Sequence, residues 1–135
     1  MIHLDYPSTY SKSMTLAVRG AIQVSANEAA EIKSAGLRLL ETVLNKNSVG
    51  QDQIISIIFS LTVDLTRANP ATAARANGYH DAPLFCVQEA VVDGQIGRII
   101  RLLLTYRSGS GRVPVPVYLE GAQVLRPDLN DSFSS

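Results

Sequence analysis

Apolar residues between positions 27 and 46 recur at helical spacing and predict the clearest element of this chain. The preceding Ser25-Ala26-Asn27-Glu28 is typical of a capping box, in which side chains hydrogen-bond the free backbone groups at the start of a helix. Polar residues fall on the opposite face, so we expect one amphipathic helix covering one face of a sheet. The apolar stripe consists of Ala29, Ile32, Gly36, Leu39, Leu40 and Val43.

Five other segments are rich in β-branched and apolar residues and predict strands at 15–24, 53–63, 84–92, 98–106 and 116–125. A short helix is expected where Asn69 and Pro70 precede an alanine-rich run that closes at Gly78, because asparagine caps helices and proline starts them. These elements indicate an α+β domain with a single sheet. We expect one domain over residues 15–129, between a flexible leader at 1–14 and a flexible tail at 130–135.

One long helix can cover only one face of such a sheet. Since 46% of the residues are hydrophobic, the other face is expected to pack on a second copy of the chain. The sequence therefore favours a homo-oligomer, with the clefts between subunits as candidate binding sites.

The charge balance argues against nucleic acid and membranes as partners. Lysine plus arginine equals aspartate plus glutamate, 12 each, so no global field attracts a polyanion. No apolar run approaches transmembrane length, and residues 1–14 lack the apolar core of a secretory signal. The single cysteine excludes an intrachain disulfide framework and suits the cytoplasm.

The arginines point to a small anionic ligand. Nine of the 12 basic residues are arginine, the planar reader of carboxylates. Arg101 stands inside the most apolar run, at 99–104, with no acid beside it in the sequence. An unpaired buried guanidinium costs several kcal/mol, so its partner is either a carboxylate elsewhere in the fold, such as Glu89, or a ligand. The rest of the sequence favours the ligand.

The other candidates are ordinary when taken singly. Cys86 and Glu89 are three residues apart and lie on opposite faces of a regular strand, so both serve one site only if the strand bulges or ends there. The two histidines, His3 and His80, lack the spacing of a metal site. Three arginines are each, when taken alone, ordinary surface residues: Arg19, Arg75 and Arg126. Tyr118 alone is a core aromatic with its hydroxyl at the rim.

Such a set is rich in arginine and poor in bases. It suits the binding of carboxylates and the stabilisation of developing negative charge better than proton transfer or covalent catalysis.

The ordered segments resemble the barrel-type bacterial chorismate mutases, which are trimeric and distinct from the all-helical class. The resemblance runs from about residue 16 to 129. The segments that carry it are Ala17-Val18-Arg19-Gly20-Ala21, Asn69-Pro70-Ala71 leading to Arg75, Cys86-Val87-Gln88-Glu89, Ile99-Ile100-Arg101, Val117-Tyr118-Leu119-Glu120 and Val124-Leu125-Arg126-Pro127-Asp128-Leu129.

This resemblance implies a mixed five-stranded sheet in each subunit and a trimeric pseudo-α/β barrel with active sites in the intersubunit clefts. The implied activity is isomerisation of chorismate to prephenate by a pericyclic rearrangement, in aromatic amino-acid or related biosynthesis, with no cofactor and no metal. Arg101 would reach the ether oxygen, while Glu89 and Cys86 would engage the ring hydroxyl. The implied substrate-binding set is Arg19 and Tyr118 on the side-chain carboxylate, Arg75 and Arg126 at the mouth, and Leu125 and Ala71.

Three positions depart from the family pattern: Asn69 replaces a bulky aromatic, Thr72 a basic residue and Phe85 a smaller one. The polar run 130–135 predicts a lid that folds over the site when ligand binds. Two alternatives stay open at this point. One is a trimeric imine-deaminase-like or small-carboxylate-binding protein with a related subunit, and the other is an interaction module whose charges are all paired.

Overall fold

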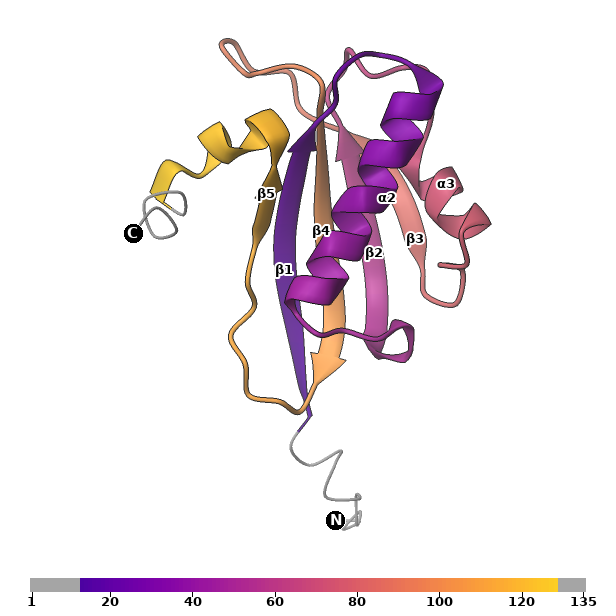
Figure 1. Cartoon of the computed structure of the whole chain (residues 1–135), viewed down its shortest axis with the longest axis vertical. Helices are drawn as coiled ribbons and strands as arrows, with labels where there is room; N and C mark the ends of the chain where they lie inside the picture. The colour runs from indigo at the N-terminus through magenta and orange to yellow at the C-terminus, as the bar shows by residue number, and fades with distance from the viewer. Residues whose placement is uncertain (1–12, 129–135) are drawn as a thin grey trace.

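A computed structural model describes residues 13–128 and shows one mixed five-stranded sheet with the order β3-β2-β4-β1-β5 (Figure 1). The leader up to residue 12 and the tail from residue 129, including the expected lid, lie outside the described residues. The strands are β1 (Met14–Gln23), β2 (Ile54–Leu61), β3 (Leu84–Gln88), β4 (Ile99–Ser108) and β5 (Val117–Leu119). The helices are α2 (Ala29–Lys46) and α3 (Pro70–Ala76), with 3₁₀ turns η1 (Gln51–Gln53) and η2 (Glu120–Leu125).

The centre of the sheet is antiparallel and its two edges are parallel. β4 pairs antiparallel with both β1 and β2, whereas β5 runs parallel to β1 and β3 parallel to β2. The α+β class and the mixed sheet are therefore confirmed. Because β3 and β5 are the outer strands, the residues that they carry lie at opposite edges of the sheet.

Both helices lie on one face of the sheet (Figure 1). The stripe predicted for α2 is the buried one, with Leu39, Leu40 and Val43 fully covered. Glycine permits the close helix contact with α3, because a Cβ on Gly36 would come within 2.6 Å of Cβ of Pro70. Asn69 caps α3 as predicted: its Oδ1 accepts a hydrogen bond of 2.9 Å from the Ala71 amide.

The capping box predicted for α2 is wrong. The helix begins at Ala29, and the cap residue Glu28 makes no side-chain hydrogen bond to the helix. Ser25 instead donates to the carboxylate of Glu31, and Asn27 bonds the segment after β2, accepting from the amide of Thr66. The capping side chains are therefore engaged elsewhere, Ser25 by a side chain in the first turn of α2 and Asn27 by a distant segment.

Two predicted strands are too long. β3 ends at Gln88 rather than at residue 92, and β5 contains only Val117–Leu119 before the chain turns into η2. Glu120 adopts a left-handed φ of 55°, which ends the extended backbone of β5. This turn brings Leu125 and Arg126 back toward the sheet, where a continued strand would have carried them away.

The sheet face opposite the helices is uncovered in the single chain, as expected. Apolar side chains stand exposed on it, among them Phe85, Val87 and Leu103. Within the described part of the chain, no helix is both long and apolar enough to cross a membrane.

Candidate active site

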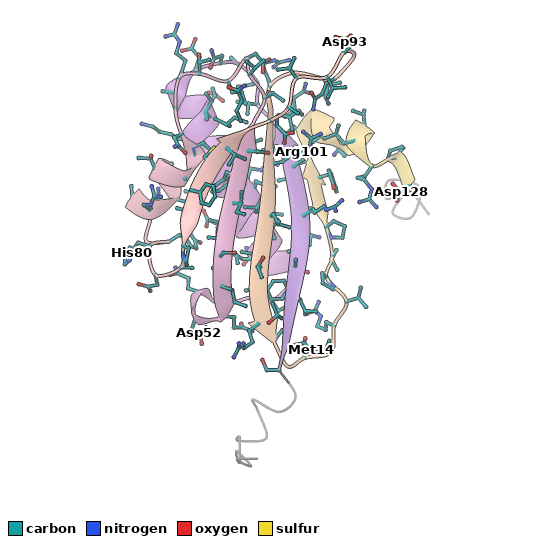
Figure 2. All side chains as sticks on the ribbon, turned by 180° about the vertical axis from the view of Figure 1, so that it is seen from behind. Met14, Asp52, His80, Asp93, Arg101 and Asp128 are labelled. Carbon is teal, nitrogen blue, oxygen red and sulfur yellow. The ribbon has the colours of Figure 1, made fainter. Side chains whose placement is uncertain are left out.

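The alternation of β4 divides its side chains between the core and the uncovered face. Ile100, Leu102 and Leu104 are buried beneath the helices, so Arg101 and Leu103 point the other way. In the register, Arg101 lies between Ser60 of β2 and Ala21 of β1. Figure 2 looks onto this face and shows Arg101 level with the C-terminal segment.

A cavity of about 570 Å³ opens on this face between β4, β1, the end of β3 and η2. It brings together six of the nine candidate residues: Arg19, Glu89, Arg101, Tyr118, Leu125 and Arg126. The remaining lining is Gly20, Ile58, Ser60, Val87, Gln88, Ala90, Leu102 and Leu103. Cationic groups therefore face one another across a largely aliphatic floor.

Arg101 has an internal acid after all, and it is not fully buried. Its Nη1 lies 3.0 Å from Oε1 of Glu89, and 32% of the side chain is exposed. The expectation of an unpaired, buried guanidinium is corrected to that extent. However, Nη1 itself is buried and forms no hydrogen bond within the described residues, because its N–H groups do not point at the carboxylate oxygen. Glu89 therefore balances the charge of Arg101 in part, while the exposed part of the Arg101 side chain lines the cavity.

Glu89 reaches the cavity because β3 has ended one residue earlier. Its backbone N–H donates 2.8 Å to the carbonyl of Leu61, which holds the chain beside β2 as the side chain turns to the uncovered face. The Ser60 hydroxyl donates to Oε1 of Glu89, the same oxygen that contacts Arg101. The possibility that the strand ends between Cys86 and Glu89 is thus realised at Gln88.

The far side of the cavity is formed by Tyr118 and Arg126. The Arg126 guanidinium carbon lies 5.9 Å from the centre of the Tyr118 ring. Its Nε and Nη2 donate to the two carboxylate oxygens of Asp128, at 3.2 and 3.0 Å. Asp128, and after it Tyr118, raise the pKa of Arg126 above its ordinary value. Arg19 is exposed and projects from β1, the strand between β4 and β5, beside Leu103.

Three candidates are not brought to this cavity within one chain. Ala71 is buried in α3, and Arg75 donates from α3 to the carbonyl of Leu84. Cys86 packs partly against the core on the helix side of β3, and burial raises the pKa of its thiol. These groups lie toward the β3 edge of the sheet, away from the β1–β5 edge that carries Arg19 and Tyr118.

Sequence reasoning missed Ser60 as a site residue. The residue pattern predicts the strand β2, but the pairing of Ser60 with Arg101 depends on strand order and register, which cannot be read from a single sequence.

The three positions that depart from the family pattern have plain structural settings. Asn69 caps α3, whereas Thr72 and Phe85 are exposed.

The fold and cavity define a small α+β domain whose uncovered sheet face holds a cavity lined by three arginines. Residues 15–129 match the family described as chorismate mutase type I. The chain belongs to that family.

Named relatives agree with this assignment. The chain is 37% identical over 121 residues to chorismate mutase AroH of Thermus thermophilus, covering 88% of this chain and 99% of the relative. It is 33% identical over 119 residues to chorismate mutase AroH of Bacillus subtilis, covering 87% and 94%. Its structure matches a chorismate mutase from Clostridium thermocellum with a TM-score of 0.75 at 39% identity, covering 81% of this chain and 98% of that one.

Proposed function

We propose that this chain isomerises chorismate to prephenate by placing fixed charges around a pericyclic rearrangement. The observation that carries the proposal is that Arg101 lines the cavity, while its buried Nη1, in ionic contact with Glu89, makes no hydrogen bond to any described residue. The reaction breaks one C–O bond as one C–C bond forms within a single molecule. It transfers no proton and needs no nucleophile, so a site rich in arginine and poor in bases suits it.

Two effects accelerate such a reaction. The site holds the substrate in a compact shape with its reacting ends close together. It also presents a fixed donor where the ether oxygen gains negative charge as the C–O bond breaks. Arg101 supplies that donor, and because its interaction strengthens as the charge develops, it favours the transition state over the ground state.

The other cavity residues bind and orient. In the proposed complex, Arg19 and Tyr118 hold the side-chain carboxylate, and Glu89 accepts a hydrogen bond from the ring hydroxyl. Leu125 and Arg126 close the mouth from η2. The aliphatic floor excludes water, which strengthens each of these charge interactions.

We further propose that the active unit is a homotrimer whose sites are shared between subunits. The support is the split of the candidate set: Ala71, Arg75 and Cys86 lie toward the β3 edge, while the cavity lies toward the β1–β5 edge. A neighbour that presents its β3–α3 edge to this cavity would unite both halves and cover the exposed apolar face. A cytoplasmic location stays a prediction from the single cysteine.

Turnover tests the reaction directly. Purified chain incubated with chorismate should consume it and release prephenate in equal amount, followed by proton NMR. An assembled chain that leaves chorismate at its uncatalysed rate of decay contradicts the proposed function.

Mixing two inactive variants tests the shared site. Arg75→Ala and Arg101→Ala chains, denatured and refolded together in equal amounts, should regain activity, because about one quarter of the sites in a random mixture combine the two intact halves. Each variant refolded alone is the control. No recovery in mixed trimers of verified composition would mean that one subunit supplies the whole site.

A further inference from the structure

We propose that Ser60 is a positioning residue for this reaction. Its hydroxyl holds the Glu89 carboxylate so that one oxygen faces Arg101 and the other faces the substrate. The inference rests on the proposed function and adds to it a residue that does not itself touch the reacting atoms.

The sheet register places Ser60 where it can do this. Ser60 and Arg101 are directly paired across β2 and β4, with both side chains on the uncovered face. Glu89 approaches from the end of β3, the other neighbour of β2. Serine, arginine and glutamate therefore come from three adjacent strands or strand ends, and the short serine side chain leaves room for the glutamate above it.

The contacts on Glu89 are asymmetric. Oε1 accepts from the Ser60 hydroxyl and also contacts Nη1 of Arg101, whereas no described residue donates to Oε2. The Glu89 side chain is 18% exposed and lines the cavity. Oε2 is the oxygen left to accept a hydrogen bond from a bound hydroxyl group.

Without Ser60, the Glu89 carboxylate and the Arg101 guanidinium have a competing arrangement. A carboxylate that loses the serine contact can rotate about its terminal bond and meet the guanidinium with both oxygens, the preferred fork-to-fork geometry. That arrangement would occupy the N–H groups that Arg101 offers to the ether oxygen. Ser60 keeps the ion pair on one oxygen, so its loss should slow the chemical step more than it weakens binding.

Steady-state kinetics test this role with a split between kcat and KM. Ser60→Ala should lower kcat by about tenfold or more, as expected for the loss of a hydrogen bond to a charged group, with KM within about twofold of wild type. Ser60→Thr keeps the hydroxyl and should retain most of kcat. Ser56→Ala, on the same strand and face but outside the cavity, is the matched control and should leave both constants unchanged.

A double variant separates positioning from packing. If Ser60 acts through Glu89, adding Ser60→Ala to Glu89→Ala should change kcat no further. An equal loss in both backgrounds, or wild-type kinetics for Ser60→Ala, overturns the proposal.

A crystal structure of Ser60→Ala supplies a readout that does not depend on turnover. It should show both oxygens of Glu89 within hydrogen-bond distance of Arg101, and an unmoved carboxylate would refute the positioning role. If the wild-type chain failed to convert chorismate while this rotation was seen, the proposed function would fail and the positioning of Glu89 by Ser60 would stand.

Discussion

The guanidinium of Arg126 donates a pair of hydrogen bonds, of 3.2 and 3.0 Å, to the carboxylate of Asp128, two residues along the chain. This is the two-pronged geometry that an arginine uses for a substrate carboxylate. Asp128 therefore accepts hydrogen bonds from Arg126, the residue proposed to stand at the cavity mouth. An anionic substrate must compete with Asp128 for Arg126 and also approach its negative charge.

Replacing this acid should strengthen substrate binding. Asp128→Asn removes the competing charge, so we expect KM for chorismate to fall by up to about fivefold, the scale of an exposed ion pair, with kcat nearly unchanged. The gain should shrink as salt is added, because exposed charges are screened. Steady-state kinetics at two ionic strengths measure both effects.

The Arg126→Ala background provides the control for that experiment. There Asp128→Asn should leave KM almost unaltered, since no guanidinium remains to be released. A rise in KM for Asp128→Asn alone would show that the acid holds Arg126 in its binding position instead of competing for it.

Removing the guanidinium of Arg101 should reduce catalysis steeply. Loss of one transition-state donor typically lowers kcat by about 10²–10³, and Arg101→Ala also removes a full charge. Arg101→Lys keeps the charge but loses the planar guanidinium, so its kcat should lie between those of the wild type and Arg101→Ala. Near-normal turnover by an Arg101→Ala chain of unchanged assembly would remove this residue from the mechanism.

The elements set by local pattern were predictable. The stripe on α2 and the apolar runs of β1, β2 and β4 each bury one face, so periodicity alone located them within a few residues. The ends of β3 and β5 were not, because they depend on where a partner strand stops and on the left-handed Glu120.

The candidate site was also predictable in part. The residues themselves singled out Arg101 by its charge in an apolar run, and the resemblance supplied its companions. Neither source indicated that Asp128 engages Arg126 or that Ser60 bonds Glu89, since both contacts depend on the folded geometry of η2 and the strand register. Ala71, Arg75 and Cys86 were predicted for the same site, yet one chain does not bring them to it.

Cys86 should be dispensable as a nucleophile. Burial raises the pKa of its thiol above the ordinary 9.0, so the residue is protonated near neutral pH and poorly reactive. We expect Cys86→Ala to lower kcat/KM by no more than about tenfold, the scale of one neutral hydrogen bond. A covalent mechanism would instead require almost complete loss.

Alkylation by iodoacetamide checks the state of the thiol independently. The rate should rise with pH and reach half its maximum above pH 9.0, with denatured chain as the reference. Fast labelling of the native chain at neutral pH would contradict the assignment of a half-buried, protonated thiol.

Asp64 ties the end of β2 to the start of β4 and should make the fold sensitive to acid. Its Oδ1 accepts 2.6 Å from the Thr62 hydroxyl, and both oxygens lie near the backbone N–H of Arg98, which has a left-handed φ of 58°. The Thr62 hydrogen bond, opposed in part by burial and aided by the Arg98 amide, lowers the pKa of Asp64 below its ordinary 3.8. The folded state therefore binds this proton less readily than the unfolded chain.

That difference fixes the direction of the pH effect. Stability from ionised Asp64 is fully present above pH 3.8 and is lost as the pH falls below it, through the lower folded pKa. Asp64→Asn should be less stable than wild type at pH 7 and lose less stability over the acid range, measured by urea unfolding at fixed chain concentration. Asp93→Asn, at the exposed tip of the loop before β4 (Figure 2), is the matched control and should follow the wild-type curve. If the free energies of unfolding of the wild type and Asp64→Asn fell in parallel through the acid range, ionised Asp64 would not stabilise the junction of β2 and β4.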